Sequence, residues 1–491
     1  MNDPARVPVI AAVGQAIERD EPVGPIDLAE RAARAALEAA RGLAPRIGLV
    51  SVVGILSPVG PSPAGDLSAR LGVEPARVET TTIGGNTPQW LVNRAASEIA
   101  AGRLDVALVA GAEAMRSSWA RGATGQPPVA AASSSAADSV VGDARPGVGA
   151  AEMGAGLVLP AHLYAMFESA LAARQGRSFA THRSELGRLM APFTRVASGH
   201  PTAWFRQERS PEEIATPSPD NRLVAEPYTK LMTAFLGVDQ GAALIVCSLE
   251  AARASGMDDG AVFVWSGADV NDVWFPTARP DLGSSPAIAE AVGAALGANG
   301  LGVDDLCALD LYSCFPVAVE MAAEALGVRL DDHRGLTVTG GLPYFGGPGN
   351  DYTTHAVATM VERIRTEGGV GLVTGMGWYV TKHSVGVYGS TPPPQGWRLA
   401  DTGGAQERID ASALPLATRG GEDAVVEAST VVYDGGGAVS GVPVIARLAD
   451  GSRVAASCAH DGDQREALAG SSLVGTKVRI LDDPARYRLT G

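Results

Sequence analysis

The side chains best suited to chemistry lie in two short segments of the C-terminal half of this 491-residue chain. Cys314 follows a strand-like run of apolar residues, which would place it at the carboxyl end of a strand, where the sites of α/β proteins gather. Tyr312 stands two positions earlier, and the imidazole of His383 could serve as a base near neutral pH. We therefore take Cys314, Tyr312 and His383 as candidate catalytic residues. The alternative for Cys314 is a buried structural cysteine, because free cysteine is among the most buried residue types.

The second segment begins with the turn-like sequence Gly375-Met376-Gly377, which Tyr379, Lys382 and His383 follow directly. Lys382 beside His383 could supply a contact to a phosphate group. A surface turn with ordinary solvated charges explains the same residues. Met376 is expected in the core.

A glycine-rich segment, Gly346–Asn350, could suggest a phosphate cradle, but it lacks the spacing of a dinucleotide-binding or Walker motif. Asn350 and Asp351 are expected to be the N-cap residues of the helix that follows. His355 is expected on a face of that helix rather than in a catalytic role.

The four cysteines form no CxxC pair and show no cysteine–histidine spacing typical of zinc sites, so we expect neither a metal nor disulfides. Few cysteines in so long a chain fit a reducing compartment. The N-terminal apolar run is short and lacks a clear cleavage site, and no later stretch reaches the length of a membrane span. A cytoplasmic protein is therefore expected.

Strand-like and helix-like segments alternate over residues 1–118 and again over residues 241–391, which predicts α/β units with mostly parallel strands. Strands are expected at 7–13, 48–56, 78–83, 106–110, 242–247, 261–265, 306–311, 336–339 and 370–374. Helices are expected at 26–41, 87–101, 285–297, 316–327 and 351–366. Thr82–Gly85 and Thr339–Gly341 each introduce a glycine turn, a helix and a strand, which suggests two similar halves, although βαβ units are common enough for a chance match.

Two further segments break this alternation. Residues 119–240 hold a loop excursion and a helical stretch at 157–189, and we interpret them as either a surface insertion or a lid or binding domain. Residues Pro392-Pro393-Pro394 are typical of a stiff linker. Residues 395–491, which follow it, contain short β-rich runs between glycine-rich turns, which predicts a small closed barrel.

Acidic residues outnumber basic ones, 54 against 39, and the resulting net charge of −15 argues against a nucleic-acid or anionic-membrane partner. The barrel region alone has 10 basic and 13 acidic residues, and its aromatic residues are Trp397, Tyr433 and Tyr487. A barrel that binds single-stranded nucleic acid needs a basic groove with stacking aromatics. We therefore expect no nucleic-acid partner and no membrane partner.

Four ordered segments over residues 5–390 resemble the thiolase superfamily, and most of all its sterol-carrier-protein thiolase branch with thiolase-like actinobacterial relatives. They are Gly85–Pro88 leading through Ile99–Asp105 to Gly111–Met115; Tyr312–Phe315, similar to His-Asp-Cys-Phe; Gly340–Leu342 to Gly346–Pro348, similar to Gly-Gly-Leu to Gly-His-Pro; and Gly375–Gly377, similar to Cys-x-Gly. The resemblance implies a thiolase fold, in which two similar βαβ halves form α-β-α-β-α layers with an inserted loop domain. The segments Thr430–Tyr433, Pro443–Ala446 and Gly475–Val478 resemble the OB-type barrel of acyl-CoA-binding proteins that partner thiolases.

The sequence departs from this family at positions that carry its chemistry. The family's spacing to Gly102 puts the nucleophilic cysteine at Gly85, and glycine cannot form an acyl-enzyme. Gly347 replaces the histidine of Gly-His-Pro, Tyr312 replaces the histidine of the second segment, and Gly375 replaces the cysteine of Cys-x-Gly. These losses together favour lost or altered catalysis.

Other features of the family's site are retained. Cys314 matches the cysteine that acts as acid/base in this branch, and backbone N–H groups near Gly85 and Gly377 could still form an oxyanion hole. The resemblance implies coenzyme A or acyl-CoA as ligand, without a tightly bound cofactor, and a loop domain that contributes to the binding site. The expected pocket residues are Asn86, Gly347, Asn350, Tyr379 and Lys382.

Three functions remain open, so whether the chain is an enzyme is undecided. The first is an acyl-CoA-binding, thiolase-like protein of lipid or fatty-acid metabolism without thiolase activity. The second is an active acyltransferase, such as an acetyl-CoA acetyltransferase, or a carbon–carbon lyase that uses Cys314 with Tyr312 or His383. The third is a scaffold subunit whose barrel recruits an enzyme of lipid metabolism. The resemblance implies a homodimer, but the altered segment at Gly85, where family dimers meet, and the added barrel leave a monomer open.

Overall fold

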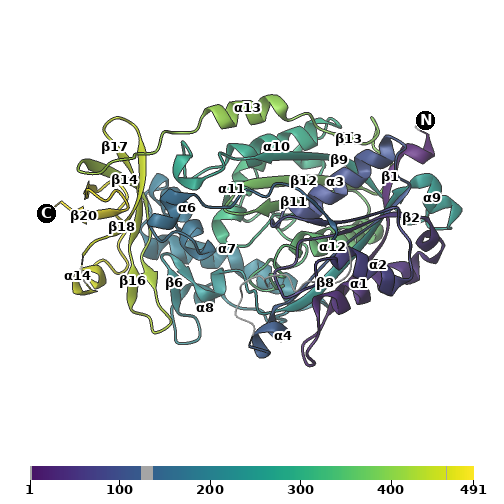
Figure 1. Cartoon of the computed structure of the whole chain (residues 1–491), viewed down its shortest axis with the longest axis horizontal. Helices are drawn as coiled ribbons and strands as arrows, with labels where there is room; N and C mark the ends of the chain where they lie inside the picture. Colours follow the sequence, from purple (N-terminus) through teal and green to yellow (C-terminus); the bar gives the residue numbers. More distant parts are fainter. Residues whose placement is uncertain (1–2, 123–136, 461, 491) are drawn as a thin grey trace.

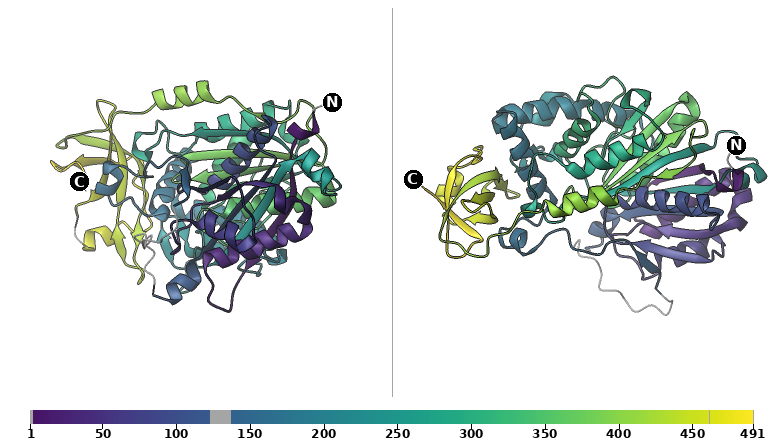
Figure 2. Two further views of the ribbon diagram at one scale, coloured as in Figure 1. Left: turned by 45° about the vertical axis from the view of Figure 1, so that its right-hand side comes forward. Right: turned by 90° about the horizontal axis from the view of Figure 1, so that it is seen from above.

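The computed structural model describes residues 3–122, 137–460 and 462–490. Figure 1 shows a large α/β body, with the N-terminus at one end, and a β-rich lobe that contains the C-terminus at the other. The two views of Figure 2 show the same separation between body and lobe. No helix among the described residues is both long and apolar enough to cross a membrane.

The body is built from two similar halves, as predicted, but the prediction of mostly parallel strands is wrong. β8 pairs antiparallel with both β1 and β4, and β12 pairs antiparallel with both β11 and β9. In the first half, the strand order is β3-β2-β4-β8-β1, and in the second it is β10-β11-β12-β9. The order β2-β4-β8-β1 of the first half corresponds to the complete order of the second. Only two residue pairs between β1 and β9 join the halves into one large sheet. The strands are β1 (Pro8–Ile17), β2 (Ile47–Val52), β3 (Arg77–Thr81), β4 (Val106–Ala114), β8 (Asp239–Ser248), β9 (Val262–Asn271), β10 (Ala308–Asp310), β11 (Val370–Gly377) and β12 (Lys382–Gly389).

Two helices form the layer between the halves. These are α3 (Thr87–Ala100), which contacts β4 and β8 as well as β11 and β12, and α12 (Tyr352–Glu367), which likewise contacts strands of both halves. Glycines in the strands admit polar side chains of α3: a Cβ at Gly386 would lie 2.2 Å from Gln89 Nε2, and one at Gly267 would lie 2.3 Å from Asn93 Oδ1. The outer layers are α1 (Pro25–Ala39) on the first half and α10 (Pro286–Gly297) on the second. The predicted α-β-α-β-α layering is confirmed.

Some predicted elements are wrong. Residues 336–339 form no strand, so the second half lacks a counterpart of β3. The helical stretch at 157–189 is two helices, α6 (Pro160–Arg174) and α7 (Phe179–Gly199), because Gly176 adopts a left-handed φ of 67° between them. Lys382 and His383 lie in no surface turn, since they begin β12 and both are buried.

The predicted C-terminal barrel is confirmed as a closed barrel of five strands, in the order β14-β17-β18-β20-β19. Its strands are β14 (Asp423–Ser429), β17 (Pro443–Leu448), β18 (Arg453–Cys458), β19 (Lys477–Ile480) and β20 (Arg486–Leu489). The barrel has a hydrophobic core of its own, which includes Val426, Val444, Val478 and Tyr487. The preceding helix α13 (Gly403–Ala411) and the closing strand β20 were not expected from the sequence.

A second, four-stranded sheet ties the barrel region to residues 119–240. Its order is β16-β15-β6-β7, and Val432 of β15 pairs with Ala225 of β6. The strands are β6 (Leu223–Ala225), β7 (Tyr228–Thr229), β15 (Val432–Tyr433) and β16 (Val439–Gly441). Part of the predicted loop excursion, residues 123–136, lies outside the described residues. The segment after it forms β5 (Ser139–Val141), which pairs with β3.

Candidate active site

A cavity of about 400 Å³ lies where α6, residues 233–236 and the ends of β10 and β11 converge. Five of the residues singled out from the sequence share its wall: Gly85, Tyr312, Cys314, Asn350 and Tyr379. None of the described residues on this wall is charged or a histidine. The remaining lining residues are Leu56, Ile83, Gly84, Leu159, Pro160, Ala161, Tyr164, Thr233, Ala234, Leu236, Phe315, Leu342, Gly349, Met376 and Trp378. The cavity is therefore predominantly apolar.

Tyr312 fills the space beside Gly85. A Cβ built on Gly85 would lie 2.1 Å from the Tyr312 hydroxyl oxygen and 2.6 Å from the Met376 carbonyl oxygen. Contacts this short do not occur between real Cβ atoms and their neighbours. The two positions are therefore coupled: with Tyr312 in this orientation, residue 85 has no room for a side chain.

The Cys314 thiol is buried, with only 7% of the residue exposed. Burial raises the pKa of this thiol to about 12 because a low-dielectric surrounding disfavours the thiolate. It also raises the pKa of Tyr312 well above its ordinary value. At neutral pH both groups are protonated, so they can donate hydrogen bonds but are poor nucleophiles.

Tyr164 is a wall residue that the sequence analysis missed. Its hydroxyl donates to the Trp378 carbonyl oxygen at 2.9 Å and lies 3.4 Å from Met376 Sδ. Its ring stacks on Phe315, with the centroids 4.5 Å apart. Met376 was expected in the core, and although it is buried it forms part of this wall. A tyrosine within an apolar helical stretch was the available signal, since a buried hydroxyl needs a partner.

Asn350 supports the loop before α3 instead of capping α12. Its Oδ1 accepts from the Gly84 N–H at 2.9 Å, and its Nδ2 donates to the Gly54 carbonyl oxygen at 2.7 Å. Asp351 occupies the N-cap position of α12 but makes no side-chain capping bond. His355 is buried within α12, where Nδ1 lies 2.8 Å from Gln15 Oε1, in keeping with a packed helix histidine.

Three further candidates face a neighbouring hollow of about 650 Å³: Asn86, Lys382 and His383. Its other lining residues are Thr82, Thr87, Trp90, Gly142–Ala144, Asp269–Asn271 and Ser384. The Lys382 ammonium donates to the carbonyl oxygen of Ile83, which lines the first cavity, so Lys382 lies between the two spaces. Burial lowers the pKa of Lys382 to about 8.

His383 is not placed with Cys314. Its Nε2 lies 3.1 Å from the Val380 carbonyl oxygen, and burial lowers its pKa to about 4. The imidazole is therefore neutral at physiological pH and serves a backbone contact. It lines the second hollow and not the cavity that holds Cys314 and Tyr312.

The two remaining glycine candidates lie just behind the cavity wall. A Cβ on Gly377 would lie 2.4 Å from Asn86 Oδ1, so this glycine permits the close approach of α3. The Gly347 N–H donates to the Phe235 carbonyl oxygen at 2.8 Å, and its nearest neighbours include the wall residue Ala234. The carbonyl oxygen of Gly85 accepts from the Thr353 hydroxyl at 2.7 Å, which fixes the backbone there.

The turn between β11 and β12 is strained. Trp378 and Val380 have φ angles of 54° and 55°, a left-handed conformation that is costly for residues other than glycine. Such strain gathers at functional sites, where the surrounding structure enforces it. Here it directs Trp378 and Tyr379 to the cavity.

Of three comparisons with known proteins, the one with solved structures agrees with this fold. No protein-family model and no curated protein matches the chain. Among solved structures, the crystal structure of a monomeric SCP2-thiolase-like protein type 1 from Mycobacterium smegmatis is 33% identical, covers 100% of both chains and gives a TM-score of 0.86. A second structure, the Ltp2–ChsH2(DUF35) aldolase, is 21% identical over 78% of this chain and 98% of its own, with a TM-score of 0.60, and thus shares the fold.

Proposed function

This chain belongs to the SCP2-thiolase-like family, and from that premise we propose that it binds acyl-CoA thioesters without carrying out thiolysis or Claisen condensation. The observation that carries the proposal is the Tyr312 hydroxyl, which lies where a side chain at residue 85 would have to be. Covalent acyl transfer needs a nucleophile, and the resemblance to thiolases puts it at residue 85. A protonated phenol instead offers a hydrogen-bond donor to a thioester carbonyl.

The properties of the cavity support an acyl ligand. Its volume of about 400 Å³ and its apolar wall suit a short or medium acyl group. Residues 159–161 and 233–236 belong to the segment between the halves, so that segment contributes to the proposed binding site. A role in lipid metabolism follows from such a ligand.

Thermal unfolding with a series of CoA thioesters tests this proposal. A ligand at about 100 times its Kd should stabilise the chain by about 2.7 kcal/mol, and acyl-CoA should do so more than free CoA. Ala161→Phe, which narrows the cavity, should abolish the difference between acyl-CoA and CoA, whereas Ala173→Phe on the exposed side of the same helix should keep it. If no CoA thioester stabilises the chain at millimolar concentration, the acyl-CoA proposal fails and a scaffold role is favoured.

Thiolysis of acetoacetyl-CoA is the complementary assay. We expect no turnover above that of the uncatalysed reaction, with or without Cys314. Turnover that Cys314→Ala abolishes would contradict a non-catalytic protein.

The second candidate is an acyltransferase or carbon–carbon lyase, because Cys314 and Tyr312 face one cavity as two protonated groups. The Ltp2–ChsH2(DUF35) structure is described as an aldolase, which raises the lyase alternative for this chain. Such an enzyme would use Tyr312 or Cys314 as a general acid, without His383. Loss of acyl-CoA cleavage in Tyr312→Phe, with binding retained, would favour it.

A further inference from the structure

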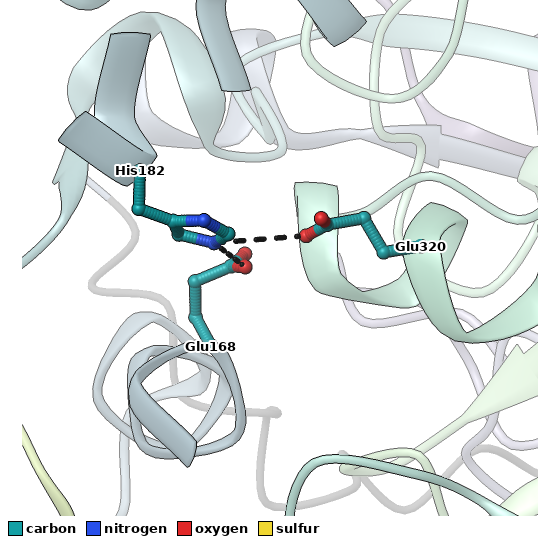
Figure 3. Close-up of side chains that lie close together, drawn as sticks. All are labelled: Glu168, His182 and Glu320. Carbon is teal, nitrogen blue, oxygen red and sulfur yellow. Dashed lines mark hydrogen bonds and ion pairs between the residues drawn. The ribbon is translucent and has the colours of Figure 1, made fainter. Parts of the chain in front are cut away.

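Three ionisable side chains meet inside the molecule, away from the cavity: Glu168 of α6, His182 of α7 and Glu320 of α11 (Pro316–Leu326). Figure 3 shows the two carboxylates directed at the same edge of the imidazole. His182 Nε2 lies 2.6 Å from Glu168 Oε1 and 3.8 Å from Glu320 Oε2. Glu168 and His182 are fully buried, and Glu320 is 6% exposed.

This cluster has two acidic side chains and, within the described residues, no lysine or arginine paired with them, since Arg177 acts on it without forming an ion pair. Two carboxylates share one imidazole, and in the described part of the chain no lysine or arginine forms an ion pair with Glu168 or Glu320. Glu320 Oε2 has no hydrogen-bond partner, although it is buried and directed at the cluster. Two buried carboxylates that face one imidazole, with no lysine or arginine of the described chain paired to either, are an unfavourable arrangement unless a cation balances their charge.

We propose that Glu168, His182 and Glu320 bind one divalent transition-metal cation, with Zn²⁺ the preferred ion. One imidazole nitrogen and two carboxylate oxygens are a donor set that Zn²⁺ takes, and the two negative charges balance the ion. The three ligand atoms lie within 4.8 Å of one another. Ligands at about 2.0–2.2 Å from zinc in tetrahedral geometry are about 3.3–3.6 Å apart, so small side-chain rotations suffice.

A route for the ion exists beside Glu320. This residue borders a hollow of about 490 Å³, which is also lined by Arg177, Glu185, Leu186, Arg188, Leu189 and Val328–Asp331. Water from that hollow can supply the fourth ligand that three protein ligands leave open.

The location gives the ion a structural role. It would join α6 and α7, which belong to residues 119–240, to α11 of the second half. The Tyr228 hydroxyl donates to Glu168 Oε2 at 2.7 Å, a contact of the kind that orients metal ligands. The Tyr228 ring lies 5.4 Å from that of Phe315, a cavity-wall residue, so the bound ion would stabilise this wall. This inference does not depend on the proposed acyl-CoA ligand.

Metal analysis of the full-length chain tests the site. Protein stripped with a chelator and re-equilibrated with Zn²⁺ should bind about one equivalent by elemental analysis and gain thermal stability. Glu320→Gln and His182→Gln should lose the bound zinc and its effect on Tm. Glu185→Gln, at the rim of the same hollow with 40% of its side chain exposed, should behave as the unsubstituted chain.

The proposal has clear contrary results. If the unsubstituted chain binds less than about 0.1 equivalent of Zn²⁺, Mn²⁺ or Fe²⁺ and its Tm does not change, the cluster is a proton-sharing network and no metal site. Zinc retained in full by both variants would place the ion elsewhere and also overturn it. If a variant does not fold, zinc content and Tm of the unsubstituted chain before and after chelation decide alone.

Discussion

Residues 85 and 312 show how one substitution can depend on another. A tyrosine at position 312 puts its hydroxyl oxygen 2.1 Å from the place of a Cβ at position 85, so the glycine and the tyrosine are a matched pair. A cysteine introduced at position 85 alone would collide with the Tyr312 phenol. A side chain at position 85 and the present orientation of Tyr312 therefore exclude each other.

We predict that Gly85→Cys destabilises the chain by about 1–3 kcal/mol, as overpacking of a core does. Adding Tyr312→His should recover part of this loss, with a coupling energy of about 0.5–3 kcal/mol. Recovery should be incomplete because the Met376 carbonyl oxygen still lies 2.6 Å from the new Cβ. Urea unfolding of the two single variants and the double variant measures the coupling, and strictly additive effects would contradict it.

Lys382 provides a prediction about pH. Burial lowers the pKa of its ammonium to about 8 from the ordinary 10.5. Between these values the unfolded chain binds the proton more tightly than the folded chain, so the free energy of unfolding rises with pH from about 8 to 10. Below about pH 8 both states hold the proton, and the full cost of burying the charged ammonium remains. Removing the group by Lys382→Met should stabilise the chain most at pH 7, by up to about 3 kcal/mol, and by less at pH 9.5. Urea unfolding at both values measures the difference, and a benefit that does not change with pH would contradict the assignment.

Part of the candidate site could be predicted from residue types and order alone. The grouping of Gly85, Tyr312 and Cys314 depends on motif order, and the structure places all three on one cavity wall. The assignment of His383 to the same site could not succeed, because the sequence did not reveal that β12 begins at Lys382. Successive side chains of a strand point to opposite faces. His383 therefore lies outside the cavity, although it is close in sequence to the cavity residues Met376, Trp378 and Tyr379.

At the scale of elements, the alternating pattern predicted the two halves but not all of their strands. Strand β12 reads KHSVGVYG, and its charged start and two glycines hide a buried strand. The closing barrel strand β20 reads RYRL and carries its arginines outward, so its hydrophobic signal is a single buried tyrosine and a partly buried leucine. In both cases tertiary pairing decides the strand, and local preference does not.

Arg453 of β18 joins the barrel to the body. It is 2% exposed, its guanidinium donates to the carbonyl oxygens of Arg279 and Pro280, and it pairs with Glu427 at 2.5 Å. Arg453→Ala would leave two carbonyl oxygens without their donor, and we predict a loss of about 2–4 kcal/mol. The expected signature in calorimetry is a barrel transition that separates from that of the body.

The control for this variant is Arg479→Ala on β19. Its side chain is 51% exposed and pairs with Asp423 at the surface, so its loss should cost about 0–1 kcal/mol. If Arg453→Ala unfolds in one transition and is no less stable than Arg479→Ala, the body and barrel are held together by the mixed sheet of β15 and β6 instead.

For the whole molecule, the barrel and the body are parts of one continuous structure. Val432 pairs with Ala225 across the mixed sheet, and the Ser429 N–H donates to the Ser169 hydroxyl oxygen of α6 at 3.0 Å. The proline run at 392–394 suggested a stiff linker to a separate unit. The sequence alone does not show whether the unit after such a linker packs against the body. That packing depends on contacts between residues more than 200 positions apart, which no local pattern contains.

The large sheet has one edge that bears on oligomeric state. Beyond β3, which leads to Gly85, the chain adds its own short strand β5, so the edge of β3 is already paired within the molecule. The carboxylate of Asp138 holds the start of β5: it accepts from the Ser62 and Thr80 hydroxyls, at 2.6 and 2.7 Å, and from the Ala64 N–H at 2.7 Å. The new edge strand, β5, is three residues long, and so short an edge offers a second chain few free backbone groups, which fits the monomeric relative.

We therefore predict that the chain is a monomer, with the mass of one chain in light scattering at micromolar concentrations. Asp138→Ala should release β5, expose the edge of β3 and produce concentration-dependent association. Asp143→Ala is the matched control, because the Asp143 carboxylate pairs with the guanidinium and the backbone N–H of Arg145, at 2.6 and 2.9 Å, and its loss should leave the mass unchanged. A stable dimer of the unsubstituted chain would show that the family's dimer contact persists despite β5. If Asp138→Ala folds and stays monomeric, release of β5 does not cause association, and the prediction that β5 keeps the chain monomeric is wrong.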